Sequence, residues 1–285
     1  MPNLKEIRNR ISSVKSTMQI TSAMKMVSAS KLKKAQDAIT AMRPYSDKLT
    51  ELLQNLSASL DADSASVYAK ERPVNKVLIV SITSNKGLCG AFNSNIIKQS
   101  VSLLHGEYGE KEVSFLCVGK KGNDILGKRH TIVENCSDVF DDLTFNKVAD
   151  IAEQLMSYYS EGTFDKIILV YNKFKNAATQ TLMTEQYLPI IPIEGKRSQT
   201  DYILEPNEAQ IVSHLIPKSL KTQLFKAIRD SFASEHGARM TAMHKATDNA
   251  SELRDQLTLT YNKARQAAIT NEILEIVGGA EALKG

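Results

Sequence analysis

One loop of the sequence has residue types that suit ligand chemistry. It reads TSNKGLCGAFN, from Thr83 to Asn93, and it follows an apolar run and precedes a helical pattern. Gly87 and Gly90 could form a phosphate-binding turn, because backbone N–H groups at a helix start favour anions. The loop has neither the GxxxxGK[ST] spacing of a P-loop nor a GxGxxG fingerprint. We therefore favour a tight turn that needs small residues, and keep a nucleotide-binding α/β protein as the alternative.

Nucleophilic and metal chemistry find little support. Cys89 lies in the same loop, but no histidine is near it in the sequence, which favours a small buried thiol over a nucleophile. His214 and His236 are too isolated to predict a metal site. The acidic cluster within 138–142 lacks the spacing of a calcium-binding EF-hand. We expect no catalytic residue, no metal ligand and no cofactor.

Basic charge is concentrated near the amino terminus. The formal net charge of the chain is +4, yet residues 1–48 hold ten Lys or Arg against three Asp or Glu. Such a segment suits an acidic partner, a nucleic acid or an anionic surface, although a solvated helix face explains the charges equally well. No aromatic residue precedes Tyr45, which disfavours nucleic-acid binding.

Targeting signals and disulfides are not expected. The sequence has no run of 18 apolar residues, and its start, MPNLKEIRNR, lacks the apolar core of a signal peptide. The cysteine count is odd and includes no CxxC pair, which is typical of a reduced, cytosolic compartment.

Two long helical patterns occupy the ends of the chain. Residues of a mostly apolar stripe from Leu4 to Thr21 alternate at spacings of three and four, a heptad seam that continues with a small drift to Met42. The helix is predicted to extend to 56–60, with a bend or jog near Pro44. A second pattern begins near residue 207, and Pro217 either starts a new helix or kinks it. Neither helix can bury its seam alone, so we expect them to form an antiparallel coiled coil. The seam predicted for the second helix is Met240, Met243, Ala246, Ala250, Leu253, Leu257, Tyr261, Ala264 and Ala268.

Between these helices the pattern becomes that of strands. Residues 76–82, 112–118 and 166–171 are short, nearly continuous apolar runs, typical of buried parallel strands, and helical patterns lie between them. Residues 179–190 suggest a further, antiparallel edge strand. This alternation predicts the α/β class. The expected architecture is a coiled coil of helices within 1–60 and 207–285, plus a central Rossmann-like α/β domain within 74–195.

The last stretch of the chain combines an apolar stripe with misplaced polar residues. Arg265 and Gln266 project within about 60° of Ile269, on a face that an ordinary helix would bury. They therefore contact either the partner helix or a second protein. Gly278 and Gly279 each cost a helix roughly 1 kcal/mol relative to alanine. The stripe itself is Ile269, Ile273, Ile276, Ala280 and Leu283.

These motifs together resemble the gamma subunit of F-type ATP synthase. Its C-terminal helix resembles SEHGARMTAMHKATDNASEL and NKARQAAITNEILEIVGGAEAL, within 234–253 and 262–283. Its first helix resembles residues 7–36, and the turn of its central domain resembles SNKGLCGAFN. The matches occur in the same order and span the whole chain.

The resemblance implies a rotor shaft without a catalytic site or cofactor of its own. In this family the coiled coil stands inside a ring of alpha and beta subunits, and the α/β domain lies against the epsilon subunit and the c ring. Proton flow turns the c ring, and the shaft couples this rotation to ATP synthesis or hydrolysis. No nucleic acid is implied. Membrane association arises only through the complex, on the cytoplasmic side of a bacterial inner membrane.

The resemblance also implies contacts between this chain and the alpha/beta ring. Polar residues in the GARM, ARQ and IT motifs of the C-terminal helix touch the ring in this family, and SAMKMV matches a segment near acidic loops of beta. Lys25 replaces a glutamate found in some members, which strengthens attraction to an acidic loop. No cysteine-bearing insertion of the chloroplast type occurs, which favours a bacterial source. The implied contact residues are Met24, Lys25, Arg239, Arg265, Gln266, Thr270, Glu272 and Glu275.

Overall fold

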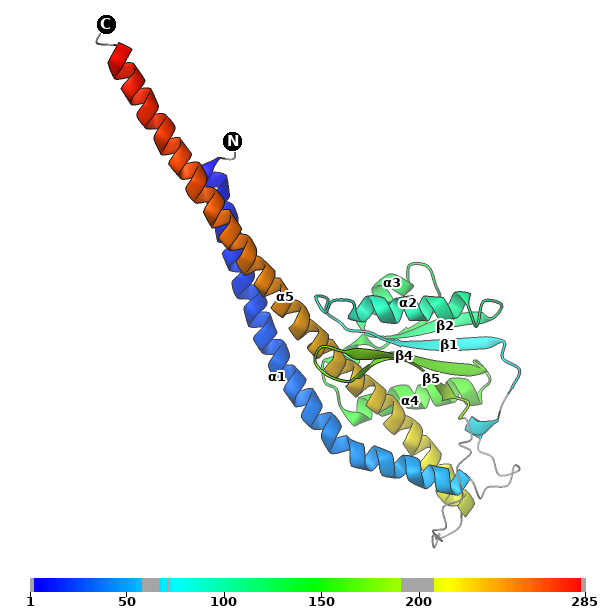
Figure 1. Ribbon diagram of the computed structural model, residues 1–285. Coiled ribbons are helices and arrows are strands. Elements are labelled where there is room, and N and C mark those ends of the chain that lie inside the picture. Colours follow the sequence, from blue (N-terminus) through cyan, green and yellow to red (C-terminus); the bar gives the residue numbers. More distant parts are fainter. Residues whose placement is uncertain (1–2, 58–66, 71, 191–207, 283–285) are drawn as a thin grey trace. The chain divides into compact units, whose positions relative to one another are not determined.

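The computed structural model describes residues 3–57, 67–70, 72–190 and 208–282 (Figure 1). Contacts within the chain define two compact units, which are described separately. The first unit contains Met1–Ser28 and Met240–Gly285, and the second contains Ala29–Arg239. Helices α1 (Leu4–Ser57) and α5 (Glu208–Ala282) each contribute to both units. No described helix is long and apolar enough to cross a membrane.

In the first unit, α1 and α5 lie side by side as an antiparallel coiled coil (Figure 1). Arg8 Nη2 donates a hydrogen bond to the Tyr261 hydroxyl at 2.8 Å, and the hydroxyls of Thr21 and Thr247 are 2.8 Å apart. A residue early in α1 thus meets one late in α5. The predicted heptad seam is confirmed, because the residues between 3 and 21 that are not exposed are Leu4, Ile7, Ile11, Val14, Met18 and Thr21.

The seam on α5 differs from the predicted one at two positions. Arg254, rather than the predicted Leu253, faces α1, and its Nη1 lies 3.8 Å from the sulfur of Met18. Leu253 is 46% exposed. Further along, Ala267 is half-buried while the predicted Ala268 is exposed. Between residues 250 and 264 the covered positions keep the alternating steps of four and three of a heptad repeat, whereas the predicted set had two consecutive steps of four after Leu253.

Both internal prolines lie inside helices. Pro44 lies within α1, and Pro217 lies within α5, which already begins at Glu208. The interpretation of Pro217 as the start of a new helix is therefore wrong. A proline lacks the N–H that would bond the preceding turn, so each position lacks one helical hydrogen bond.

The second unit is built on a five-stranded sheet of order β3-β2-β1-β4-β5. Strands β1 (Lys76–Ile82), β2 (Glu112–Val118), β3 (Ile132–Asn135) and β4 (Lys166–Phe174) are parallel, and β5 (Gln180–Leu188) is antiparallel to β4 at the edge. The expected α/β class and antiparallel edge strand are confirmed. The chain reverses its winding direction between β1 and β4, which makes the crevice there the topological switch point of the sheet.

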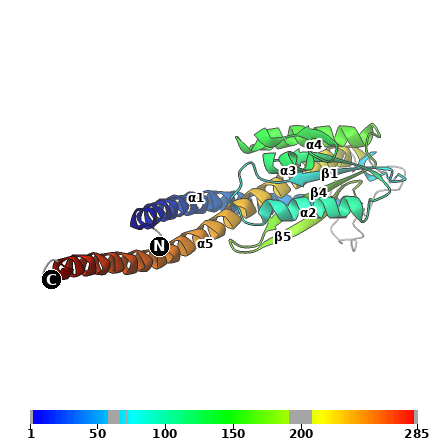
Figure 2. The ribbon, with the colours of Figure 1, turned by 90° about the horizontal axis from the view of Figure 1, so that it is seen from above.

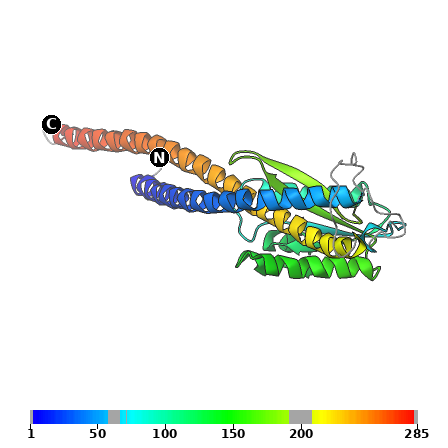
Figure 3. The same cartoon turned by 90° about the horizontal axis from the view of Figure 1, so that it is seen from below.

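Helices cover both faces of this sheet (Figure 2). Helix α2 (Phe92–His105) covers one face together with α3 (Lys120–Leu126), and α4 (Phe145–Ser160) covers the other. The amino-terminal part of α5 lies beside α4 on that second face (Figure 3). It adds Ile216, Leu220, Leu224, Ala227 and Ile228 to the core.

Two elements were missed from the sequence. Strand β3 has four residues that alternate between half-buried and exposed, and it pairs with β2 through a register shift. Helix α3 has seven residues and includes Gly122, a poor helix former. Both are too short for a hydrophobic period to stand out.

The ends of β1 and β2 approach so closely that only glycine fits. Gly119 has φ +115°, and a Cβ built there would lie 2.3 Å from the Thr83 carbonyl oxygen. The hydroxyl of Thr83 accepts a hydrogen bond from the Gly122 N–H at 2.9 Å. These contacts fix the loop that follows β1 against the start of α3.

We expect Gly119→Ala to lower the free energy of unfolding by roughly 2–5 kcal/mol, because backbone strain and overpacking both act there. Gly87→Ala is the matched control. A Cβ at Gly87 meets nothing within 4 Å, and its φ is not positive. Urea unfolding of both variants measures the difference. Equal stabilities would contradict the close approach at Gly119.

Candidate functional site

Helix α5 crosses the switch-point crevice of the sheet. The Ser231 hydroxyl donates to the carbonyl of Ile82, the last residue of β1, at 3.3 Å. The Ser234 hydroxyl donates to the carbonyl of Asn172 in β4 at 2.9 Å. Every residue of α5 from Ser231 to Arg239 is buried or half-buried. Open α/β sheets bind ligands at this crevice, and here a helix of the same chain occupies it.

Arg239 is the centre of a buried polar cluster. Its side chain is about 8% exposed, and Nη1 forms an ion pair with Glu235 Oε1 at 2.6 Å. Nη2 donates to the Lys86 carbonyl at 2.7 Å, and Nε donates to the Gly87 carbonyl at 3.2 Å. Nη1 also lies 3.4 Å from His236 Nδ1. The guanidinium thus joins α5 to the loop Ser84–Gly90 that follows β1.

This geometry opposes nucleotide binding by the Gly87/Gly90 loop. The loop turns carbonyl oxygens toward the crevice, and these attract a guanidinium and repel a phosphate. The Ser84 N–H is already bonded to Asn93 Oδ1 at 2.9 Å. Both Gly90 and Leu88 have φ +60°, so the loop is a tight turn with one strained non-glycine residue. The alternative function therefore finds no support.

Cys89 is buried inside this loop. It is 2% exposed, and its sulfur lies 3.2 Å from Asn93 Nδ2. Burial raises the pKa of the thiol, and the nearby Arg239 opposes that shift. A protonated, enclosed thiol is a poor nucleophile. The expectation of a small buried thiol is confirmed.

The buried cluster perturbs the protonation of its members. Burial, followed by the positive charges of Arg239 and Lys31, lowers the pKa of His236 to about 4. Burial raises the pKa of Glu235, while Arg239 acts in the opposite direction. Nε2 of His236 has no hydrogen-bond partner among the described residues. At neutral pH His236 is therefore a neutral, packed side chain, with its ring edge-to-face against Phe232.

The predicted C-terminal contact residues lie where α1 stops covering α5 and beyond that point. Because Arg8 lies against Tyr261 and α1 begins at Leu4, the cover that α1 provides extends about one turn past Tyr261, and Ala267 is still half-buried. Residues 268–282 are all exposed. The exposed polar residues predicted to contact the ring are Arg265, Gln266, Thr270, Glu272 and Glu275.

The apolar stripe on this segment is not a core. Ile269 is 48% exposed and Ile276 is 66% exposed, so α1 does not cover the stripe. Within the described part of the chain, the side chains of Arg265 and Gln266 form no hydrogen bond with α1, so the interpretation as a contact inside the coil finds no support. Leu283 lies outside the described residues. Ile273, Leu274 and Val277 are exposed as well.

The structure does not bring all predicted contact residues together. Met24 and Lys25 are half-buried in the coiled coil of the first unit. Arg239 belongs to the second unit and is enclosed by its own chain. Its contact with the ring stays a prediction. Sequence reasoning missed the roles of Glu235 and His236, although the four-residue spacing of Glu235 and Arg239 was an available signal for an ion pair on one helix.

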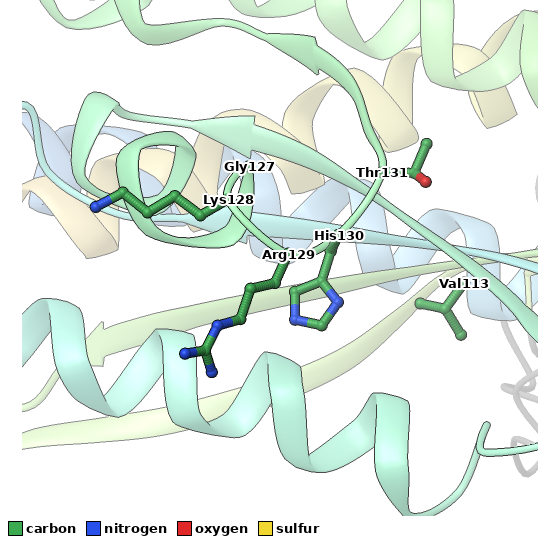
Figure 4. A pocket seen from close by; sticks show the side chains of 6 residues that line it. All are labelled: Val113, Gly127, Lys128, Arg129, His130 and Thr131. Carbon is green, nitrogen blue, oxygen red and sulfur yellow. The ribbon is translucent and has the colours of Figure 1, made fainter.

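An open hollow of about 470 Å³ lies elsewhere on the second unit (Figure 4). It adjoins the start of β2, at the opposite end of the strand from the Ser84–Gly90 loop, and holds none of the predicted contact residues. Within the described ranges, no three His, Cys, Asp or Glu residues gather as a metal site. The hollow is lined by Val113, Gly127, Lys128, Arg129, His130 and Thr131.

Comparisons with known proteins agree in sequence and in fold. The model of the ATP synthase family matches residues 3–283. The ATP synthase gamma chain of Flavobacterium psychrophilum is 68% identical over 287 residues, and 100% of each chain is covered. A chain of the central stalk and c-ring structure of Tetrahymena thermophila mitochondrial ATP synthase shares 26% identity at a TM-score of 0.60, over 80% of this chain and 99% of that one. A chain of the OSCP/F1/c-ring structure from Euglena gracilis has the same fold, with 23% identity and a TM-score of 0.72 over 98% and 94%.

The low pKa of His236 predicts a stability that depends on pH. The unfolded chain binds a proton near pH 6.5 and the folded chain only near pH 4, so the free energy of unfolding falls as the pH drops through this range. The contribution is on the order of 2–3 kcal/mol. The raised pKa of Glu235 acts in the opposite direction, so the comparison must be between variants.

We therefore expect His236→Asn to reduce the loss of stability between pH 6.5 and pH 4, measured by urea unfolding at several pH values. His105→Asn, at an exposed position, should change the pH dependence less, because it acts only through the removal of a charge near His130. An identical pH dependence in His236→Asn and the unmodified chain would show that His236 is not the titrating group.

Proposed function

Because the chain belongs to the family of ATP synthase gamma chains, we propose that it is the central-stalk rotor subunit of an F-type ATP synthase. It couples rotation driven by proton flow to ATP synthesis or hydrolysis in the alpha and beta subunits. It has no catalytic site of its own, consistent with a switch-point crevice filled by α5.

The uncovered C-terminal segment of α5 is the observation that most supports this proposal. Large apolar side chains from Ile269 to Val277 are exposed on turns that α1 does not cover, and Thr270 lies among them while Arg265 and Gln266 lie directly before them. A continuous exposed apolar surface of this kind marks a site for another protein. A ring of alpha and beta subunits around the helix would bury the apolar residues and supply hydrogen-bond partners for the polar ones.

The basic charge of α1 fits the same arrangement. Among the cations of α1, Lys25 is half-buried in the coiled coil, whereas Lys15 is exposed. Attraction between exposed charges acts over roughly 10 Å and is weakened by salt. Such attraction to acidic loops of beta guides a turning shaft without holding it at one angle. Met24, beside Lys25, is proposed to contact the same loops.

The remaining partners follow from the family. We propose that the region within 74–195 lies against the epsilon subunit and the c ring, and that the helical regions within 1–60 and 207–285 form the shaft. The chain would reach the membrane only through this complex, on the cytoplasmic side of a bacterial inner membrane.

Co-expression of the chain with the alpha and beta subunits of the same organism tests the proposal. We expect a complex that contains all three and hydrolyses ATP, and an isolated chain that does not bind ATP in the micromolar range. Failure to assemble would contradict the rotor function. Micromolar ATP binding would favour the nucleotide-binding alternative, and steep salt-dependent DNA binding would favour a nucleic-acid binder.

Truncating Arg265 and Gln266 together to alanine should reduce the ATP turnover of the complex about tenfold or more, the effect of losing one charge-assisted hydrogen bond or more at a protein interface. Because both side chains are exposed, the stability of the isolated chain should change by less than about 1 kcal/mol.

The matched control is the double truncation Lys245→Ala with Glu252→Ala, which removes two exposed side chains from the same helix. It should leave turnover within about twofold, a change of less than 0.5 kcal/mol. If the Arg265/Gln266 variant unfolds in isolation, the pair has a structural role instead.

A further inference from the structure

We propose that Arg239 is a positioning residue that fastens the Ser84–Gly90 loop to α5, so that the loop keeps its place against the helix when α5 rotates. The effect of this fastening on the coupling of rotation to ATP hydrolysis, called the torque step below, rests on the rotor function proposed above. The fastening itself rests only on the contacts within the second unit.

The middle of the loop depends on Arg239. Other hydrogen bonds hold the rest of the loop: at its first end the Ser84 N–H donates to Asn93 Oδ1 and Asn85 Nδ2 donates to the Ser137 carbonyl at 2.8 Å, and near its other end Asn93 Nδ2 donates to Cys89 Sγ at 3.2 Å. Within the loop, the Ser84 hydroxyl donates to the Lys86 carbonyl at 2.7 Å. Among the described residues, Arg239 is the only group outside the loop that bonds the carbonyls of Lys86 and Gly87. A guanidinium presents donors in a planar fork, so it can reach both carbonyls at once.

The backbone of the loop requires such a restraint. Leu88 adopts φ +60° although it is not glycine, and its side chain is 64% exposed, so packing does not hold it there. Strained residues persist where surrounding contacts over-determine them, and they concentrate at functional positions. The contact of Arg239 with the preceding two carbonyls supplies this restraint.

Glu235 lowers the free-energy cost of burying the guanidinium of Arg239. A guanidinium this deeply buried needs a compensating charge, which Glu235 provides one helical turn earlier at 2.6 Å. The Ser231 and Ser234 hydroxyls bond the ends of β1 and β4 from the same helix segment. Arg239 differs from them because it is charged and because it holds a loop rather than a strand.

The reactivity of Cys89 provides a direct measure of the loop position. Cys89 is carried by the loop, although it joins the same core as Cys117, whereas Cys117 lies in β2 and Cys136 directly follows β3. Labelling the purified full chain with a maleimide, and reading each cysteine by mass spectrometry, therefore separates release of the loop from general unfolding.

Arg239→Lys is the decisive variant, because the ammonium can still neutralise Glu235 but cannot bond both carbonyls in a fork. We expect it to accelerate labelling of Cys89 at least about tenfold, the change expected when one charge-assisted hydrogen bond is lost. Labelling of Cys117 and Cys136 should not change. Glu235→Gln keeps the fork but removes the charge that compensates the guanidinium, so it should destabilise the whole unit and raise labelling of all three cysteines together rather than of Cys89 alone.

Three results would overturn the fastening. Unchanged Cys89 labelling in Arg239→Lys would show that the loop is held without Arg239. In Arg239→Lys, faster labelling of all three cysteines together would assign Arg239 to the general stability of the fold. Labelling of Cys89 alone that is as fast in Glu235→Gln as in Arg239→Lys would show that the ion pair, and not the fork, holds the loop.

The torque step is tested in the assembled, membrane-reconstituted complex. Arg239→Lys should lower ATP-driven proton pumping relative to ATP hydrolysis, and an unchanged ratio would contradict that step. The experiments test the rotor function and the fastening of the loop independently. If the unmodified chain does not assemble with its partners, the rotor function fails while the labelling result still decides the fastening.

Discussion

The structure depends on one constraint: a helix with a single apolar seam cannot bury that seam by itself. Along its length α5 passes through four different surroundings. Its first part joins α4 on one face of the sheet, and its middle, from Ser231 to Arg239, fills the crevice at the ends of β1 and β4. Beyond that it packs on α1 until α1 ends, and the remaining turns have no cover within the described chain.

The crevice explains how a Rossmann-like fold can serve without a ligand. In such folds the loop after the first strand usually turns N–H groups toward a phosphate. Here the loop offers carbonyl oxygens to Arg239, and a helix of the same chain takes the place of the ligand. A buried ion pair is weak evidence for stability, because burying both charges is costly. Its value lies in orientation, since few other side chains could match both Glu235 and two carbonyls.

Much of this fold was predictable because its signals are local. The heptad seam from Leu4 to Thr21 and the apolar strands are periodic, and period follows directly from backbone geometry. The burial of Arg239 could not be predicted from the same signals. It depends on which way the carbonyls of a distant loop point, which is a property of the tertiary structure. Arg254 could have been predicted in place of Leu253 from spacing alone, because the seam keeps its heptad repeat there and only the apolar type of Leu253 favoured the neighbouring position.

The uncovered turns of α5 also affect how a free copy of the chain behaves in solution. Isoleucine, leucine and valine side chains about half exposed or more, from Ile269 to Val277, lie on one helix with no cover in the described chain. Surfaces of this kind favour self-association and aggregation. A free copy of the chain is therefore expected to associate with itself more as its concentration rises.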